Sequence, residues 1–279
     1  MAGFADRDLD QLLGLLEPER DPDKVPPPPA VADSQPGEVY QLGEHRLLCG
    51  DASDPELIAA FAAGTEVGAV WTDPPYGVDY EGKTERRLRI RNDNLDAPAL
   101  LERTLLALAP VLSAHAPFYL CAPGGRLNTQ FRLVLERTGW RLHEDLLWVK
   151  QQFVLGRLDY HAQHEHVLYG WAPGTSGRPG RGSPAGSRWH GDNRQSSVFF
   201  VDRPTRSEEH PTIKPVGLIT AYLLNSTRRG DWVIDPFAGS GSTLIACEQL
   251  ARRCLAVELD PVYCDVIRDR YTEYTRGPA

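Results

Sequence analysis

The sequence predicts an α/β fold with a mainly parallel sheet, and three features lead to that prediction. Short apolar runs alternate with longer segments of helical periodicity from residue 37 to the end of the 279-residue chain. This alternation is typical of parallel strands joined by crossover helices. Four of the apolar runs are followed closely by an acidic residue, at Asp51, Asp73, Asp235 and Glu258. Because open α/β sheets bind ligands at the carboxyl ends of their strands, we expect these acids to lie along one edge.

The expected strands are short apolar runs bounded by turn residues. In chain order they are Val39–Leu42, Arg46–Cys49, Val67–Thr72, Pro117–Cys121, Trp140–Lys150, Glu165–Trp171, Trp232–Ile234 and Cys254–Val257. The expected helices have apolar residues spaced by three and four. They are Asp54–Ala63, with Ser53 or Asp54 as its N-cap, then Ala97–Leu112, Leu127–Thr138, Pro211–Ser226, Ser242–Leu250 and Pro261–Tyr274.

Composition divides the chain into an appendage and one large domain. Residues 1–36 carry eight acidic residues and a run of four prolines, so we expect a flexible acidic tail with a semi-rigid spacer, either mobile or weakly docked. Residues 37–279 form the main domain. Within it, residues 173–207 are rich in glycine, proline and arginine, which predicts a long basic loop without regular structure.

Bulk properties exclude several classes of protein. No run reaches the roughly 18–20 apolar residues of a membrane helix, and the first residues have no signal-peptide pattern, so we expect a cytoplasmic protein without a membrane partner. The five cysteines contain no C-x-x-C pair, so neither a disulfide framework nor a zinc site is indicated, and no bound metal is expected.

The net charge of −8 is unfavourable for a nucleic-acid-binding protein, but the distribution of charge matters more than the sum. Arginines gather in two segments. The expected contacts to nucleic acid are Arg86, Arg87, Arg89, Arg91, Arg178, Arg181, Arg188, Trp189 and Arg194. For Trp189 the sequence leaves base contact and packing within the loop equally open. Trp148 and Trp171 are expected to pack in the core.

A strand, a glycine turn and a helix start follow one another at residues 233–243. Gly239 and Gly241 let the backbone pass close to a ligand. Asp235 can hold a cationic group, and Glu258, 17 residues beyond Gly241, suits an acid that bridges two ribose hydroxyls. Neither a third glycine nor a Gly-Lys-Ser/Thr sequence follows, which favours S-adenosylmethionine over a dinucleotide or nucleotide phosphate. A tight turn without a ligand is the alternative.

A second cluster is Asp73-Pro74-Pro75-Tyr76, directly after the strand that ends at Thr72. The double proline fixes the loop and leaves the Pro74 carbonyl free to accept a hydrogen bond. Two acceptors on the N–H bonds of an exocyclic base amine favour a localised lone pair and stabilise the positive charge that grows during attack on a sulfonium methyl. The Tyr76 ring can stack on a flipped base. The alternative is an ordinary Pro-Pro turn.

Three motifs together resemble the amino-group DNA methyltransferases. Residues 73–76 match the catalytic motif of that family, residues 235–241 match its cofactor motif, and residues 210–215 (His-Pro-Thr-Ile-Lys-Pro) match the motif just upstream of the cofactor strand. The catalytic motif comes first and the cofactor motif last, an order that resembles the beta class. The resemblance covers roughly residues 37–275. It implies a circularly permuted, Rossmann-like class I methyltransferase fold with a mainly parallel seven-stranded sheet.

The resemblance also implies roles for single residues. Asp51 would accept a hydrogen bond from the cofactor's adenine amino group, Phe237 would flank the cofactor, and Lys214 would approach its carboxylate. The expected catalytic residues are Asp73, Pro74, Pro75 and Tyr76. The expected residues for S-adenosyl-L-methionine are Asp51, Lys214, Asp235, Phe237, Gly239, Gly241, Ser242, Thr243 and Glu258.

The expected function is methyl transfer from S-adenosylmethionine to adenine N6 in double-stranded DNA by base flipping. Cytosine N4 is the runner-up, since its amine chemistry is the same. A non-catalytic, cofactor-dependent DNA-binding protein and an RNA or protein amino-group methyltransferase also stay open. The sequence leaves a homodimer and a restriction endonuclease partner open as well. The short glycine-rich segment that precedes His210 is no folded recognition domain, which puts high sequence specificity in doubt.

One further group of residues invites a metal interpretation. His161, His164 and His166 lie beside Glu165, but successive side chains on a strand alternate between faces. We therefore favour a polar strand near DNA or solvent over a metal site.

Overall fold

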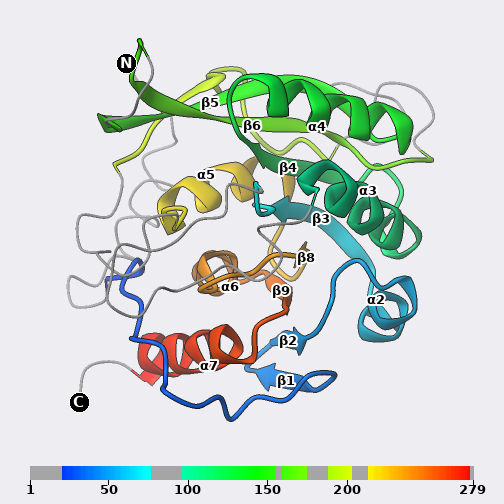
Figure 1. Cartoon of the computed structure of the whole chain (residues 1–279), viewed down its shortest axis with the longest axis vertical. Helices are drawn as coiled ribbons and strands as arrows, with labels where there is room; N and C mark the ends of the chain where they lie inside the picture. The colour runs from blue at the N-terminus through cyan, green and yellow to red at the C-terminus, as the bar shows by residue number, and fades with distance from the viewer. Residues whose placement is uncertain (1–20, 77–95, 155–158, 175–187, 203–212, 277–279) are drawn as a thin grey trace.

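The computed structural model describes residues 21–76, 96–154, 159–174, 188–202 and 213–276, which form a mixed sheet with helices on both faces (Figure 1). The strands are β1 (Val39–Leu42), β2 (His45–Cys49), β3 (Val67–Thr72), β4 (Pro117–Ala122), β5 (Arg141–Val154), β6 (Ala162–Trp171), β7 (Val198–Phe200), β8 (Trp232–Asp235) and β9 (Arg253–Glu258). The helices are α2 (Pro55–Ala62), α3 (Ala97–Leu108), the 3-10 helix η1 (Ala109–Val111), α4 (Arg126–Arg137), α5 (Val216–Ser226), α6 (Ser242–Gln249) and α7 (Pro261–Arg276).

The described strands form one nine-stranded sheet in the order β1-β2-β9-β8-β3-β4-β6-β5-β7. Five neighbouring strands of the sheet, β2, β9, β8, β3 and β4, run parallel to one another, and β7 runs parallel to β5. The pairs β1–β2, β4–β6 and β5–β6 are antiparallel. The expected number of seven strands was too low, because β1 and β7 extend the sheet at its two edges. Strand β8 lies in the middle of the sheet, between β9 and β3, although it comes late in the chain. This placement confirms the predicted circular permutation.

Strand β7 corrects the prediction that residues 173–207 have no regular structure. Val198–Phe200 pairs in parallel with β5, Leu147 opposite Val198. Three consecutive apolar residues favour an extended chain, but a run so short pairs only because a long neighbouring strand offers an open edge. The glycines and prolines on which the prediction rested lie upstream, and residues 175–187 are outside the described part.

Two helix boundaries also differ from the prediction. The α-helix expected to reach residue 112 ends at Leu108 and continues as η1, because Pro110 has no N–H to give to the helix. Helix α5 begins at Val216 rather than at residue 211, because Pro215 occupies its N-cap and disfavours helical backbone at Lys214. Lys214 therefore lies outside the helix, directly before its N-cap.

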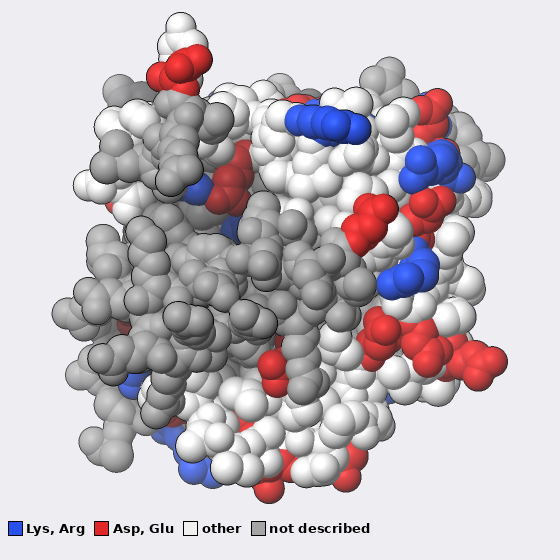
Figure 2. Space-filling model, viewed as in Figure 1, with Lys and Arg blue, Asp and Glu red and all other residues white. Residues whose placement is uncertain are grey.

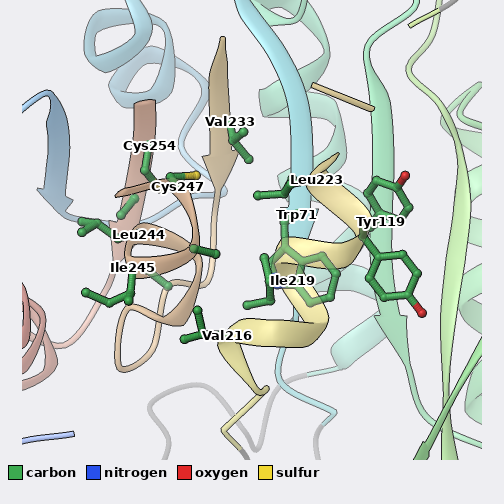
Figure 3. Packing of buried hydrophobic residues seen from close by; sticks show 14 of the residues in the cluster. Trp71, Tyr119, Val216, Ile219, Leu223, Val233, Leu244, Ile245, Cys247 and Cys254 are labelled. Carbon is green, nitrogen blue, oxygen red and sulfur yellow. The ribbon is translucent and has the colours of Figure 1, made fainter. Parts of the chain in front are cut away.

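Each face of the sheet is buried under three helices. Helices α5, α6 and α7 cover one face, and Figure 3 shows Ile219 and Leu223 of α5 near Trp71 of β3. Helices α2, α3 and α4 cover the other face with residues such as Ile58, Leu101 and Phe131. All six residues of β3 are buried, as expected for a parallel strand covered on both sides. The predicted core positions of Trp148 and Trp171 are confirmed, and all five cysteines are buried free thiols.

The described part of the N-terminal appendage, residues 21–36, is docked on the domain. Arg270 of α7 donates a hydrogen bond to the Pro22 carbonyl, and the backbone amide of Val216 donates one to Asp23. Ser34 donates from its backbone and its side chain to Asp265 of α7. Charged and polar groups that composition assigns to solvent are here paired with α7 and the start of α5.

Charge on the face drawn in Figure 2 is mixed. Described acidic and basic side chains alternate along the side formed by α2, α3 and α4. No described helix combines the length and apolar character needed to cross a bilayer.

Candidate active site

Four acidic residues lie along the carboxyl edge of the parallel strands, as the sequence predicted. Asp73 directly follows β3, and Asp235 ends β8, the strand beside it. Glu258 ends β9, next to β8, and Asp51 lies two residues beyond Cys49, which is opposite Glu258 in the β2–β9 pair. Residues from both halves of the chain therefore meet at one edge.

The turn from Asp235 to Thr243 has the backbone of a ligand-binding loop. Asp235 accepts hydrogen bonds from the backbone amide of Phe237, at 3.0 Å, and from the Thr243 hydroxyl. Gly239 and Gly241 have φ values of +54° and +86°, in the left-handed region that favours glycine. A Cβ at Gly239 would meet no atom of the described residues within 4 Å, so these residues leave the space above the turn open.

The carboxyl group of Asp235 and that of Glu258, which accepts from the Gly239 amide, are held in a low-dielectric environment. Burial raises the pKa of Asp235 to about 7, although hydrogen bonds from Thr243 and Phe237 lower it, and the neighbouring charge of Asp73 contributes to the rise. Burial likewise raises the pKa of Glu258 to about 7, against hydrogen bonds from the backbone amides of Asp260 and Gly239. Both groups gain from a ligand that brings positive charge or hydroxyl donors.

The Asp-Pro-Pro-Tyr segment closes on itself. The Tyr76 hydroxyl donates to Oδ1 of Asp73 at 3.0 Å, and the Tyr76 ring lies edge-on to Phe131 of α4, 6.2 Å between ring centroids. Pro74 is buried, while Asp73 and Pro75 are partly exposed. Asp73 and Tyr76 thus face the same small region, with one carboxylate oxygen already engaged.

Lys214 lies against Asp73, a contact that the sequence did not predict. Its Nζ is 2.6 Å from Oδ2 of Asp73 and 3.3 Å from Oε2 of Glu165, and its side chain is 8% exposed. The expected contact of Lys214 with a cofactor carboxylate stays a prediction. Burial alone would lower the pKa of Lys214, but the charges of Asp73 and Glu165 outweigh it and raise this pKa, so the amine is an ammonium.

Glu165 and Lys150 are site residues that sequence reasoning missed. Lys150 of β5 forms an ion pair with Glu165 of β6, on the other carboxylate oxygen from Lys214. Burial would raise the pKa of Glu165, but Lys214 and Lys150 lower it to about 2. The sequence did contain a signal for Glu165. Successive side chains of a strand point to opposite faces, so Glu165 lies on the other face of β6 from His164 and His166. His166 instead pairs with Asp145, 3.0 Å away. Among the described residues, no three potential ligands gather around a metal position.

The residues expected to contact DNA divide into two groups. Arg86, Arg87, Arg89, Arg91, Arg178 and Arg181 lie outside the described residues. Arg188, Trp189 and Arg194 are described, and the structure does not bring them together with Asp73.

Arg188 is at the opposite edge of the sheet from the acidic cluster. It donates to the Ser113 hydroxyl at 2.8 Å and pairs with Glu66 at 3.3 Å, both beside the start of β3. Trp189 packs 6.4 Å from the Tyr169 ring and lines a cavity of about 210 Å³ together with Trp171 and Asn225. Arg194 is exposed.

Comparisons with known proteins bear on the family and on the fold. A family model described as DNA methylase, N6_N4_Mtase, matches residues 67–269. The type II methyltransferase M2.MboI of Moraxella bovis is 34% identical over 90 residues, which are 31% of this chain and 33% of that protein. M2.DpnII of Streptococcus pneumoniae is 39% identical over 84 residues, 28% and 31% of the two chains. The matched segments thus span about a third of these two relatives.

Longer matches exist at lower identity. The type II methyltransferase M.HpaI of Haemophilus parainfluenzae is 24% identical over 254 residues, 84% of this chain and 76% of that one. The crystal structure of an M1.HpyAVI–SAM complex superposes with a TM-score of 0.58 at 21% identity and covers 81% of this chain and 98% of its own. PvuII DNA methyltransferase (cytosine-N4-specific) gives a TM-score of 0.59 at 14% identity, with 89% and 98% covered. These likenesses show a shared fold.

Proposed function

Because the chain belongs to the N6_N4_Mtase family of DNA methylases and has the class I methyltransferase fold, we propose that it transfers a methyl group to an exocyclic amine in double-stranded DNA. Adenine N6 is the favoured acceptor, and S-adenosylmethionine is the methyl donor. The observation that carries the proposal is that Asp73 and Asp235 stand at the ends of neighbouring parallel strands, so the amine-binding and cofactor-binding motifs share one edge.

The chemistry of the site fits S-adenosylmethionine. The Asp235 carboxyl can receive the ammonium of the methionine part, and Glu258 can receive ribose hydroxyls. The open space above Gly239 leaves room for a ligand against the backbone. Asp51 lies beside Glu258 at the end of the next strand, in reach of the adenine end in this arrangement. When bound, the cofactor supplies an activated methyl group on its sulfonium.

The residues of this chain then act on the target base. Asp73 and the Pro74 carbonyl accept the two N–H bonds of the amine, which favours a lone pair on nitrogen and stabilises the positive charge that develops there. A new N–C bond would form as the S–C bond of the donor breaks, and the cationic nitrogen would then release one proton to solvent. Tyr76 offers its ring for stacking with the flipped base. No residue forms a covalent bond to the base.

The acceptor base is the finer part of the proposal. The context of the sequence motifs favours adenine N6, and the same grip on an amine serves cytosine N4. One relative of similar fold carries a cytosine-N4-specific name, so this alternative has support from a specific observation. DNA contact through the arginines of residues 86–91 and 178–181 is also part of the proposal.

The test combines product analysis with one substitution. Purified protein, labelled S-adenosylmethionine and mixed-sequence DNA should yield N6-methyladenine on nucleoside analysis. N4-methylcytosine as the sole product would overturn the adenine assignment, and methylated RNA in preference to DNA would overturn the DNA assignment. Asp73→Asn should lower kcat by roughly 10²–10³-fold while the affinity for S-adenosylmethionine stays unchanged. Turnover at the wild-type rate would refute the role of Asp73.

A further inference from the structure

The Lys214 ammonium occupies the place that the proposed reaction reserves for the target amine. Its Nζ is 2.6 Å from Oδ2 of Asp73 and 6.0 Å from the centre of the Tyr76 ring. The Tyr76 hydroxyl holds the other oxygen of Asp73. Both carboxylate oxygens of Asp73 thus already accept hydrogen bonds from groups of the protein, and a base amine that binds at Oδ2 competes with the ammonium for that oxygen.

Displacement of a buried ammonium is costly unless a second anion receives it. A buried ion pair that loses one partner leaves the other charge without compensation, which strongly destabilises the site. Lys214 is 8% exposed, so solvent offers little compensation. The second anion is present: Oε2 of Glu165 is 3.3 Å from the same Nζ.

Glu165 has acceptor capacity left for this exchange. Its Oε2 is buried and accepts no hydrogen bond within the described residues, so the contact with Lys214 is a charge pair that has room to tighten. Its Oε1 is held by Lys150. Positive and negative groups therefore alternate in the order Lys150, Glu165, Lys214 and Asp73. The Lys214 ammonium can move from Asp73 toward Glu165 and still have an anion beside it.

We propose that Glu165 is a positioning residue that takes the Lys214 ammonium when the target base displaces it from Asp73. The inference rests on the proposed function, since it needs Asp73 as the acceptor of the amine. Glu165 itself touches neither base nor cofactor. The Lys214–Asp73 contact is the resting state, and the strength of Glu165 as a competitor sets how readily the base is captured.

The test measures kcat and KM for DNA at saturating S-adenosylmethionine, and base capture by fluorescence of 2-aminopurine placed at the target position. Glu165→Gln removes the competing charge, so KM for DNA should rise about tenfold and the fluorescence gain should fall. Glu165→Asp should recover most of the loss. Lys150→Met removes the other cation that pairs with Glu165, so Glu165 should attract Lys214 more strongly and KM for DNA should fall. Asp145, on the same β5–β6 hairpin, pairs with Arg132 of α4 and with His166. Asp145→Asn breaks these pairs away from Lys214 and is the matched control, with unchanged kinetics.

A double-mutant cycle separates positioning from a structural role. On a Lys214→Met background the ammonium is gone, so Glu165→Gln should add little to KM for DNA. An equal loss on both backgrounds would overturn the inference, as would wild-type KM in Glu165→Gln. If Glu165→Gln fails to fold, the sign of the Lys150→Met effect decides alone: a raised KM contradicts the proposal. Wild-type protein that methylates no DNA would instead refute the proposed function.

Discussion

Glu258 accepts a hydrogen bond from the backbone amide of Gly239 at 2.9 Å, which ties the end of β9 to the glycine turn that follows β8. Both partners are expected at the cofactor. The same carboxyl group accepts from the amide of Asp260, at 2.9 Å, and still has a pKa raised to about 7. Two backbone donors therefore do not fully offset the effect of burial on the pKa of Glu258. A ligand that offers further hydrogen-bond donors should bind best to the ionised form of Glu258.

Cofactor affinity should depend on pH near neutrality. Asp235 also has a pKa raised to about 7, and its ionised form is the one that pairs with an ammonium. The dissociation constant for S-adenosylmethionine, measured by calorimetry, should fall roughly tenfold between pH 6 and pH 8, with proton release on binding. Asp235→Asn should weaken binding and flatten this dependence. An equally steep profile in Asp235→Asn would assign the titration to another group.

The same two acids should affect stability with a definite sign. Because their pKa is higher in the folded state than in the unfolded chain, the folded protein binds more protons between about pH 4 and pH 7. Their contribution to stability is therefore present at low pH and is lost as the pH rises through about 7. Thermal unfolding of the ligand-free protein should show this decline, and Asp235→Asn should reduce it. A larger decline in the variant would contradict the assignment.

The two glycines of the cofactor turn should fail in different ways when replaced by alanine. A Cβ at Gly241 would lie 3.2 Å from two carbon atoms of Ile267 in α7, at a φ of +86°. A Cβ at Gly239 would enter open space, at a φ of +54°. The left-handed backbone costs each variant about 1 kcal/mol. Gly241→Ala should therefore lose more thermal stability, and Gly239→Ala should lose more affinity for S-adenosylmethionine relative to its loss of stability. The reverse ranking would show that the space above Gly239 is not the cofactor site.

The predicted fold succeeded where local sequence decides the structure. Strand β3 has the predicted bounds because a parallel strand buried on both faces is one continuous apolar run. Asp73 and Asp235 could be placed on one edge because carboxyl ends of parallel strands meet there. Strand β7 was missed because its three residues pair only through the edge that β5 offers. The docking of Pro22 on Arg270 joins residues 248 positions apart, and composition carries no trace of it.

The contacts among Asp73, Lys214 and Glu165 could not be predicted from the sequence either. Lys214 and Asp73 are 141 positions apart, and Glu165 comes from a third segment. The motif resemblance placed Lys214 in the site but not its partner. Alternate residues of a strand share one face, so Glu165 lies on the same face of β6 as Val167 and Tyr169, which pack in the cluster that contains α5. The sequence alone does not show which helix covers that face.

Arginine substitutions should separate DNA binding from stability. Arg188 is ion-paired with Glu66 and bonded to Ser113 beside the start of β3, so Arg188→Ala should lower the melting temperature and leave DNA affinity unchanged. Joint replacement of Arg86, Arg87, Arg89 and Arg91 by alanine should weaken DNA binding and lower the salt slope of log K by up to about 0.9 for each phosphate that the protein no longer neutralises. Binding would be measured by fluorescence anisotropy over a salt series. A reduced salt slope for Arg188→Ala would show that Arg188 contacts DNA.

The N-terminal segment should stabilise the site through Asp23. Helix α5 begins after Pro215, which has no side-chain acceptor, and Asp23 accepts from the amide of Val216 at 2.8 Å. Asp23→Ala should lower the free energy of unfolding by about 1 kcal/mol, as the loss of an N-cap does. It should also raise KM for DNA, because Lys214 lies just ahead of this helix. Asp23→Asn keeps an acceptor oxygen and should recover most of both effects. Lys24→Ala breaks only the exposed pair with Glu273, so it should change neither quantity measurably. If Lys24→Ala and Asp23→Ala behaved alike in denaturant titrations and kinetics, the cap on α5 would have no part in holding Lys214.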